Sequence, residues 1–155
     1  MRFRADRLKP VARLDGLLSR ADGRTTIPFK SRRPMVIVTW MRGEDRKWCV
    51  LADLNLASIA DVGVYIVWYA GDPGRVVCVG QGPIAAELAR VRADDTVMNF
   101  AARGQLLVTW APVSPARIDG VERFVANAWP PLLERPRSDV PPIEVNSPAW
   151  LRSFV

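Results

Sequence analysis

The chain has 155 residues, of which 49% are hydrophobic, enough for one compact domain with a core. It contains no histidine, which excludes Ser-His and Cys-His catalysis and almost any zinc site. The formal net charge is +6, but residues 1–48 carry +8 and residues 49–155 carry −2. Such asymmetry is typical of a surface for nucleic acid or an acidic partner, although a solvated basic arm gives the same composition.

The first 60 residues predict a basic N-terminal extension. Residues 5–20 place four leucines and Val11 at helical spacing, which predicts a helix. The basic loop that follows contains the candidate nucleic-acid-binding residues Arg24, Lys30, Arg32 and Arg33. Residues 35–40 ("MVIVTW") and 47–54 ("KWCVLADL") predict two strands of a β-hairpin joined by the turn "RGED". We expect this extension to pack on the rest of the chain.

The stretch "GVYIVWYAGDPGRVVCVGQG", residues 63–82, predicts two strands around a tight loop. Side chains alternate between the two faces of the first strand. One face has Tyr65, Val67 and Tyr69, and the other has Val64, Ile66 and Trp68. A loop over residues 71–74 pairs Ala70 with Arg75, Val67 with Cys78, and Tyr65 with Gly80. In this register, the side chains of Tyr65 and Cys78 lie on the same face.

The rest of the chain alternates helices and one more strand. Residues 83–95 predict a helix with Pro83 in its first turn, and residues 105–113 predict a strand. Residues 114–129 predict a second helix, with Ser114 as N-cap and Pro115 at its first position, and residues 134–149 are proline-rich. These elements predict an α+β module over residues 61–155, with a small, mainly antiparallel sheet flanked by helices.

Three features indicate the compartment. No apolar run approaches the roughly 20 residues that span a bilayer, and the N-terminus lacks the apolar region of a secretory signal. Cys49 and Cys78 lie far apart in the sequence and are expected to be reduced, buried thiols. We therefore expect a protein of the bacterial cytoplasm that does not enter a membrane.

Four short motifs occur in a fixed order along the module. They are "GVY" (63–65), "CVG" (78–80), "VERFV" (121–125) and the asparagine of "EVNSP", Asn146. With the order of predicted elements, this set resembles the GIY-YIG nuclease superfamily over residues 63–148. The resemblance implies a small antiparallel sheet with a one-metal phosphodiesterase site, in which Tyr65 helps to activate water and Glu122 holds Mg²⁺ or Mn²⁺. Asn146 matches the asparagine that closes the module and is expected to be structural.

The sequence departs from the family at two positions. Cys78 stands where the family has its second tyrosine, beside the motif glycine Gly80, and a thiol is a weaker hydrogen-bond donor than a phenol. Glu87 stands where the family has an arginine that neutralises the phosphate. Arg90, one helical turn later, is the nearest candidate to replace that arginine.

These departures favour a catalytically impaired nuclease fold that binds nucleic acid. One alternative is an active Mg²⁺- or Mn²⁺-dependent DNA or RNA endonuclease that uses Tyr65, Glu122 and Arg90. A second alternative is a protein-interaction module in a larger assembly, with the basic arm docking on an acidic protein. An inactive protein would need no metal, and no haem or nucleotide cofactor is expected in either state.

Overall fold

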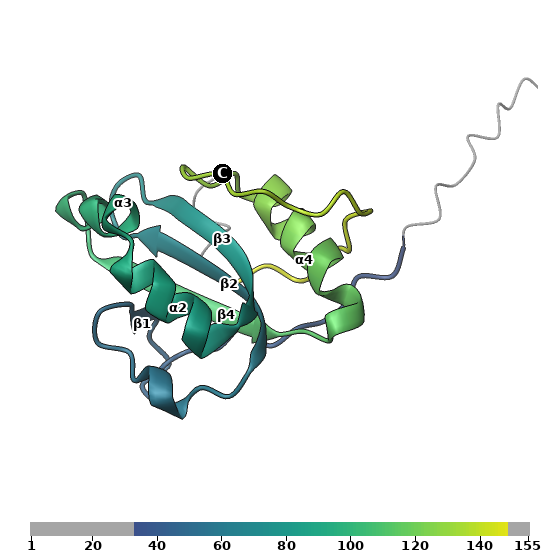
Figure 1. Cartoon of the computed structure of the whole chain (residues 1–155), viewed down its shortest axis with the longest axis horizontal. Helices are drawn as coiled ribbons and strands as arrows, with labels where there is room; N and C mark the ends of the chain where they lie inside the picture. The colour runs from purple at the N-terminus through teal and green to yellow at the C-terminus, as the bar shows by residue number, and fades with distance from the viewer. Residues whose placement is uncertain (1–32, 149–155) are drawn as a thin grey trace, which may run out of the picture. The chain divides into compact units, whose positions relative to one another are not determined.

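The computed structural model describes residues 33–148, which form one four-stranded sheet with helices on both faces (Figure 1). The strands are β1 (Cys49–Val50), β2 (Val62–Tyr69), β3 (Arg75–Pro83) and β4 (Leu106–Pro112), in the order β1-β4-β2-β3 with every pair antiparallel. The helices are α2 (Ile84–Ala93), α3 (Asp95–Met98) and α4 (Pro115–Ala128), with short 3₁₀ turns η1 (Leu56–Ser58) and η2 (Asn99–Ala102). The predicted α+β class with a small antiparallel sheet is confirmed.

Parts of the predicted extension lie outside the described residues. These are the helix over residues 5–20 and the three basic residues Arg24, Lys30 and Arg32. They remain predictions. No helix within residues 33–148 is long and apolar enough to cross a membrane.

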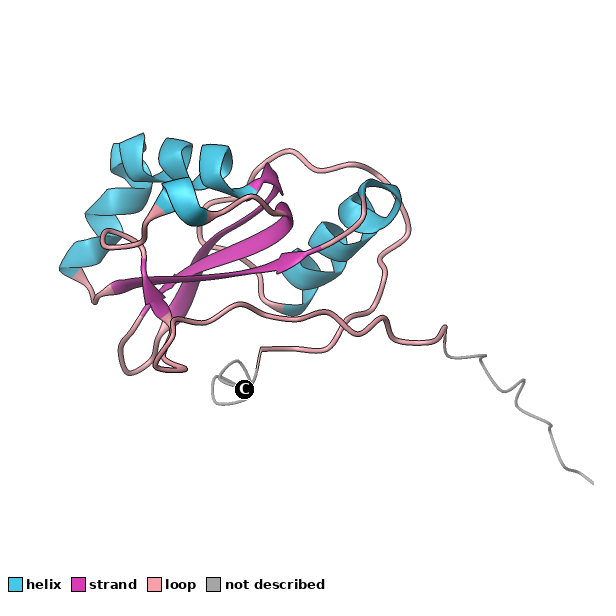
Figure 2. Cartoon of the chain, turned by 90° about the horizontal axis from the view of Figure 1, so that it is seen from below, coloured by secondary structure: helices cyan, strands magenta, loops and turns pink. Residues whose placement is uncertain are grey.

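The alternation predicted for β2 is confirmed by the two cores. Tyr65, Val67 and Tyr69 lie in a core covered by α2, whereas Ile66 and Trp68 lie in a second core covered by α4. Figure 2 shows the sheet between α4 on one side and the remaining helices on the other. The sheet is therefore buried on both faces, which explains why β2 is apolar at almost every position.

The predicted register of β2 and β3 is confirmed where it matters for the site. Tyr65 pairs with Gly80 and Val67 pairs with Cys78. The predicted pairing of Ala70 with Arg75 is wrong, because Tyr69 takes that place. A bulge between Val67 and Trp68 absorbs the one-residue slip, so the faces upstream of it are retained.

The predicted β-hairpin between residues 35–40 and 47–54 is wrong. Val36 forms an isolated parallel bridge with Val145, and β1 pairs with β4 instead. A tight turn does exist at residues 43–47, where the Gly43 N–H donates to the Lys47 carbonyl at 2.9 Å. The alternation of apolar residues predicted an extended, half-buried segment correctly, but it contains no information about which partner that segment meets.

The partner is the C-terminal part of the module, through Asn146. Its side-chain Oδ1 accepts from the Val38 N–H at 2.7 Å, and its Nδ2 donates to the Val38 carbonyl at 3.0 Å. The Asn146 carbonyl also accepts from Trp40 Nε1 at 2.7 Å. The Asn146 side chain thus pairs with Val38 as the backbone of a neighbouring strand residue would.

The proline-rich segment after α4 is ordered along the outer edge of β3. The Leu132 and Leu133 N–H groups donate to the Val76 and Val77 carbonyls at 3.1 and 2.9 Å. Farther on, the Ile143 N–H donates to the Gly120 carbonyl at 2.9 Å and returns the chain to α4. Residues 134–139 therefore follow directly on a stretch that is hydrogen-bonded to the β3 edge of the sheet.

Replacing Asn146 with alanine should destabilise the fold by about 2 kcal/mol, because two hydrogen bonds are lost and both polar groups of Val38 are left unpaired. The measurement is the free energy of unfolding from urea titration. Asn127→Ala on the exposed end of α4 is the matched control and should change stability by less than about 0.5 kcal/mol. Equal effects for the two variants would contradict the role given to Asn146.

Candidate functional site

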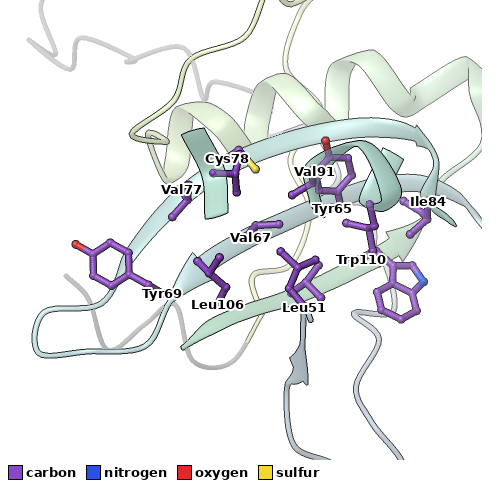
Figure 3. Close-up of a cluster of buried hydrophobic side chains, with 13 residues drawn as sticks. Leu51, Tyr65, Val67, Tyr69, Val77, Cys78, Ile84, Val91, Leu106 and Trp110 are labelled. Atoms are coloured by element: carbon purple, nitrogen blue, oxygen red, sulfur yellow. The ribbon is translucent and has the colours of Figure 1, made fainter. Parts of the chain in front are cut away.

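Tyr65 is fully buried on the α2 face, and Figure 3 shows it among the side chains of that core. Its ring lies against Gly80. A Cβ at position 80 would collide with the ring and hydroxyl of Tyr65, so the glycine makes room for the tyrosine. The Tyr65 hydroxyl accepts a hydrogen bond from Arg135 Nη1 at 3.0 Å. Burial, assisted by the neighbouring Cys78, raises the pKa of Tyr65 well above its ordinary range, although Arg135 opposes this. The hydroxyl is therefore protonated at any physiological pH.

Cys78 lies on the same face as Tyr65, as the register predicts. Burial raises the pKa of its thiol to about 11, with Arg135 lowering it and Asp94 raising it. At neutral pH the side chain is an uncharged thiol, which is a weak donor and a poor nucleophile. The second-motif position therefore provides packing rather than an ionisable group.

Glu122 is nearly buried on α4, with 5% of its surface exposed. Burial raises the pKa of its carboxyl group, while Arg137 opposes this more strongly than any other charge. Asp119 and Glu87 raise the pKa of Glu122, and Arg135 lowers it. Arg135 and Glu87 shift the pKa of Tyr65 in the same two directions. Because α4 and Tyr65 lie on opposite faces of the sheet, we infer that these groups approach each other at the β3 edge.

Glu87 and Arg90 form an ion pair within α2. Arg90 Nη1 lies 2.7 Å from Glu87 Oε1, and the side chain of Arg90 is 76% exposed. The predicted substitute arginine is thus placed on Glu87 at the surface. It neutralises the anionic residue at the family's arginine position and is not among the charges that act on Tyr65 or Glu122.

Two arginines that the sequence reasoning missed do reach the site. Arg135 and Arg137 come from "ERPR" in the segment along the β3 edge, and Arg135 Nη2 also lies 3.9 Å from Asp94 Oδ2. The available signal was two arginines separated by one proline in an extended stretch, where side chains two positions apart point the same way. Only the path of the chain places that stretch against Tyr65 and Glu122.

Arg33 is the one predicted nucleic-acid-binding residue within the described part of the chain. It lines an apolar cavity of about 390 Å³ together with Pro34, Phe124, Pro142, Ile143 and Glu144. This cavity lies beside α4, and none of its lining residues belongs to the cluster around Tyr65. The structure therefore does not bring Arg33 together with Tyr65 and Glu122.

The residues around Glu122 are a poor match for a resident divalent ion. Within residues 33–148, no group of three Asp, Glu, Cys or His side chains could hold a metal. Arg137 and Arg135 already act as the opposing charges of Glu122, and Arg90 neutralises Glu87. Guanidinium groups next to these carboxylates repel a second cation.

Comparisons of the chain with models of protein families, with curated proteins and with solved structures gave no match. The likeness to the GIY-YIG superfamily therefore depends on the four motifs and on the order of the elements. What the site does must be argued from its own residues.

Replacing Gly80 with alanine should destabilise the fold by about 1–3 kcal/mol, because the new methyl group overlaps the Tyr65 ring between two packed strands. Urea unfolding measures the effect. Gly71→Ala is the control, since a Cβ there meets only ordinary contacts of 3.7 Å or more. A Gly80→Ala protein as stable as the Gly71→Ala protein would show that the Tyr65 ring is not fixed over the strand.

Glu122→Gln should remove a pH dependence of stability. A carboxyl group whose pKa is raised in the folded state binds more protons there than in the unfolded chain, so its stabilisation is complete below the ordinary pKa of 4.5. That stabilisation is lost as the pH rises through the folded-state pKa. The urea midpoint of wild type minus that of Glu122→Gln should therefore decrease as the pH is raised from 4 to 7. A constant or rising difference would contradict the direction of the shift.

Proposed function

We propose that the chain is a nucleic-acid-binding protein on a GIY-YIG-like frame that no longer cleaves its ligand. The observation that carries this proposal is the pairing of Glu87 with Arg90 at 2.7 Å. A glutamate stands where the resemblance requires a phosphate-neutralising arginine, and the nearest arginine on α2 is used to neutralise that glutamate. The helix therefore presents no net positive charge at this point to a phosphodiester.

The state of the other motif residues supports loss of cleavage. Tyr65 is protonated and buried, and its hydroxyl oxygen already accepts from Arg135. A water molecule to be activated would have to compete for that oxygen in a site closed to solvent. Cys78 cannot replace the missing tyrosine, because its buried thiol stays uncharged and is a weak donor.

The distribution of charge supports nucleic acid as the ligand. Residues 1–32 contain nine Lys and Arg against three Asp and Glu, whereas residues 33–155 contain 13 of each. The whole formal excess of +6 therefore precedes the module. Basic side chains in this part of the chain, with Arg24, Lys30 and Arg32 as the candidates together with the adjacent Arg33, would contact phosphates irrespective of base sequence. Cys49 and Cys78 form no disulfide, which supports a cytoplasmic location as part of this proposal.

Binding of DNA or RNA by the full chain should weaken steeply with salt. Replacing Arg24, Lys30, Arg32 and Arg33 with glutamine should flatten the plot of log K against log salt by about 0.9 for each lost contact with duplex DNA. Fluorescence anisotropy with a labelled duplex and a labelled single strand measures both slopes. Glutamine at four exposed arginines within residues 33–148, Arg46, Arg75, Arg103 and Arg117, is the matched control.

The same preparation should leave plasmid DNA and RNA intact with Mg²⁺ and with Mn²⁺. Binding that ignores salt, or an unchanged slope in the fourfold N-terminal variant, would remove the basis of the proposal. Cleavage that disappears in Glu122→Ala would replace it with the active endonuclease that uses Tyr65 and Glu122. One observation favours that alternative, since Arg135 bonds the Tyr65 hydroxyl and also lowers the pKa of Glu122.

A protein-interaction module is the second alternative, favoured by an exposed apolar pair. Met35 and Ile37 are 47% and 71% exposed on the outer side of the segment held by Asn146. Co-purification of one stoichiometric protein, through an interaction that is insensitive to salt and lost in Ile37→Ser, would favour this alternative over nucleic-acid binding.

A further inference from the structure

Arg137 is the unexplained charged group of the module. Its Nε and Nη2 are shielded from solvent and have no hydrogen-bond partner within residues 33–148. Leaving donors of a charged group unpaired and out of water is costly, so native structures keep few of them. The residue as a whole is only half-buried, and it lies in an irregular segment that could have placed the side chain in solvent. Its inward position therefore calls for an acceptor.

The two free donors have a defined shape. Nε and Nη2 lie along one edge of the planar guanidinium group and donate in parallel, which matches two oxygens of one phosphate or carboxylate. Lysine cannot reproduce this fork, because its ammonium group is a single point charge.

Further groups at the same edge complete the surroundings of the fork. Arg135 is two residues away on the same extended segment, and it binds the Tyr65 hydroxyl oxygen at 3.0 Å. Both arginines act on Glu122, which places them near one carboxyl group. Gln81 donates from Nε2 to Asp119 at 2.6 Å, and its Oε1 is also shielded and without a partner. The fork thus offers paired donors to a bound group, and Gln81, whose partner Asp119 also raises the pKa of Glu122, carries an unpaired acceptor on β3.

We propose that Arg137, with Arg135 beside it, forms a binding site for one phosphate group at the β3 edge. This inference deepens the proposed function, on which it rests for the choice of phosphate over other anions. The arginine expected on α2 would then be replaced by two arginines from the segment after α4. Two oxygens of the phosphate would accept hydrogen bonds from Nε and Nη2 of Arg137. A protonated phosphate oxygen or a neighbouring hydroxyl would donate to Gln81 Oε1.

Because Nε and Nη2 are shielded from solvent, the part of the segment that carries Arg137 has to shift for a ligand to reach the fork. Backbone hydrogen bonds at Leu133 and Ile143 anchor the two ends of this segment. Between them, Arg135 is held by Tyr65 and Asp94. Beyond Arg137, Arg123 of α4 contacts the Ser138 carbonyl at 3.3 Å and pairs with Asp139, whose side chain is 98% exposed. An ion pair with one fully solvated partner contributes little to stability, so a local movement of residues 137–142 that leaves Arg135 in place is inexpensive.

The test is NMR of the ¹⁵N-labelled full chain titrated with inorganic phosphate. A shielded Nε–H exchanges slowly with water and gives an observable resonance, which Arg137→Lys assigns by its loss. We expect this resonance to shift on titration. Arg137→Lys keeps the charge beside Glu122 and should preserve the urea midpoint, yet weaken phosphate binding about tenfold or more. Arg117→Gln, at an exposed arginine of α4, is the control and should bind as wild type.

A short single-stranded DNA with and without a 5′-phosphate identifies the source of the phosphate. If only the phosphorylated strand binds more weakly to Arg137→Lys, the site takes a terminal phosphate. If both strands do, the site takes an internal phosphodiester. If neither strand depends on Arg137, but inorganic phosphate does, the site stands and its nucleic-acid role is lost. An unmoved Nε–H resonance, or equal phosphate affinity of wild type and Arg137→Lys, overturns the site. If the site is overturned but the strands still bind through the N-terminal basic residues, the proposed function is unaffected.

Discussion

The packing of the Tyr65 ring over Gly80 is the constraint on which the site depends. The two residues face each other across β2 and β3, and only a residue without a Cβ leaves space for the ring between these strands. This contact allows the Tyr65 hydroxyl to reach the end of the core where Arg135 approaches. It also fixes which face Cys78 occupies, because a slip of one residue would move that side chain to the α4 face. Tyr65, Gly80 and Cys78 therefore lie side by side because of one cross-strand contact.

The charges around that contact have been redistributed relative to the pattern that the sequence resembles. The anionic residue of α2 is neutralised locally by Arg90, while the positive groups that act on Tyr65 and Glu122 come from the segment after α4. This exchange leaves the polar cluster close to electrical balance. It also puts its cations on an irregular segment rather than on a helix, where a small displacement changes their distance from the carboxylates.

Such an arrangement suits recognition better than hydrolysis. Hydrolysis of a phosphodiester needs an ionisable group near a water molecule and a cation opposite the developing charge. Here the tyrosine and the thiol are held in their neutral forms by burial, and arginines stand next to the carboxylate that would hold a metal. A protein of this kind would bind through its basic N-terminal residues and keep the module as a rigid support, with the β3 edge as a second contact point.

The fold and the motif pairs could be predicted from the sequence because they depend on local patterns. Alternating apolar residues specified the faces of β2, loop length brought Tyr65 opposite Gly80, and Pro115 marked the start of α4. The bulge beyond Val67 did not change these assignments, since it lies on the loop side of the motif residues.

The partners of the irregular segments could not be predicted, because their backbone groups bond to residues about a hundred positions away or to a sheet edge. Residues 35–40 had the pattern of a strand, but whether they met β1 or Asn146 depended on where the C-terminal segment ran. In the same way, "ERPR" has no periodicity, and only the hydrogen bonds of Leu132 and Leu133 to β3 bring its arginines to Tyr65 and Glu122. The sequence by itself determined which residues share a face, because side-chain direction follows from the backbone period. The tertiary structure decided which charges meet, because that depends on how the chain returns to the sheet.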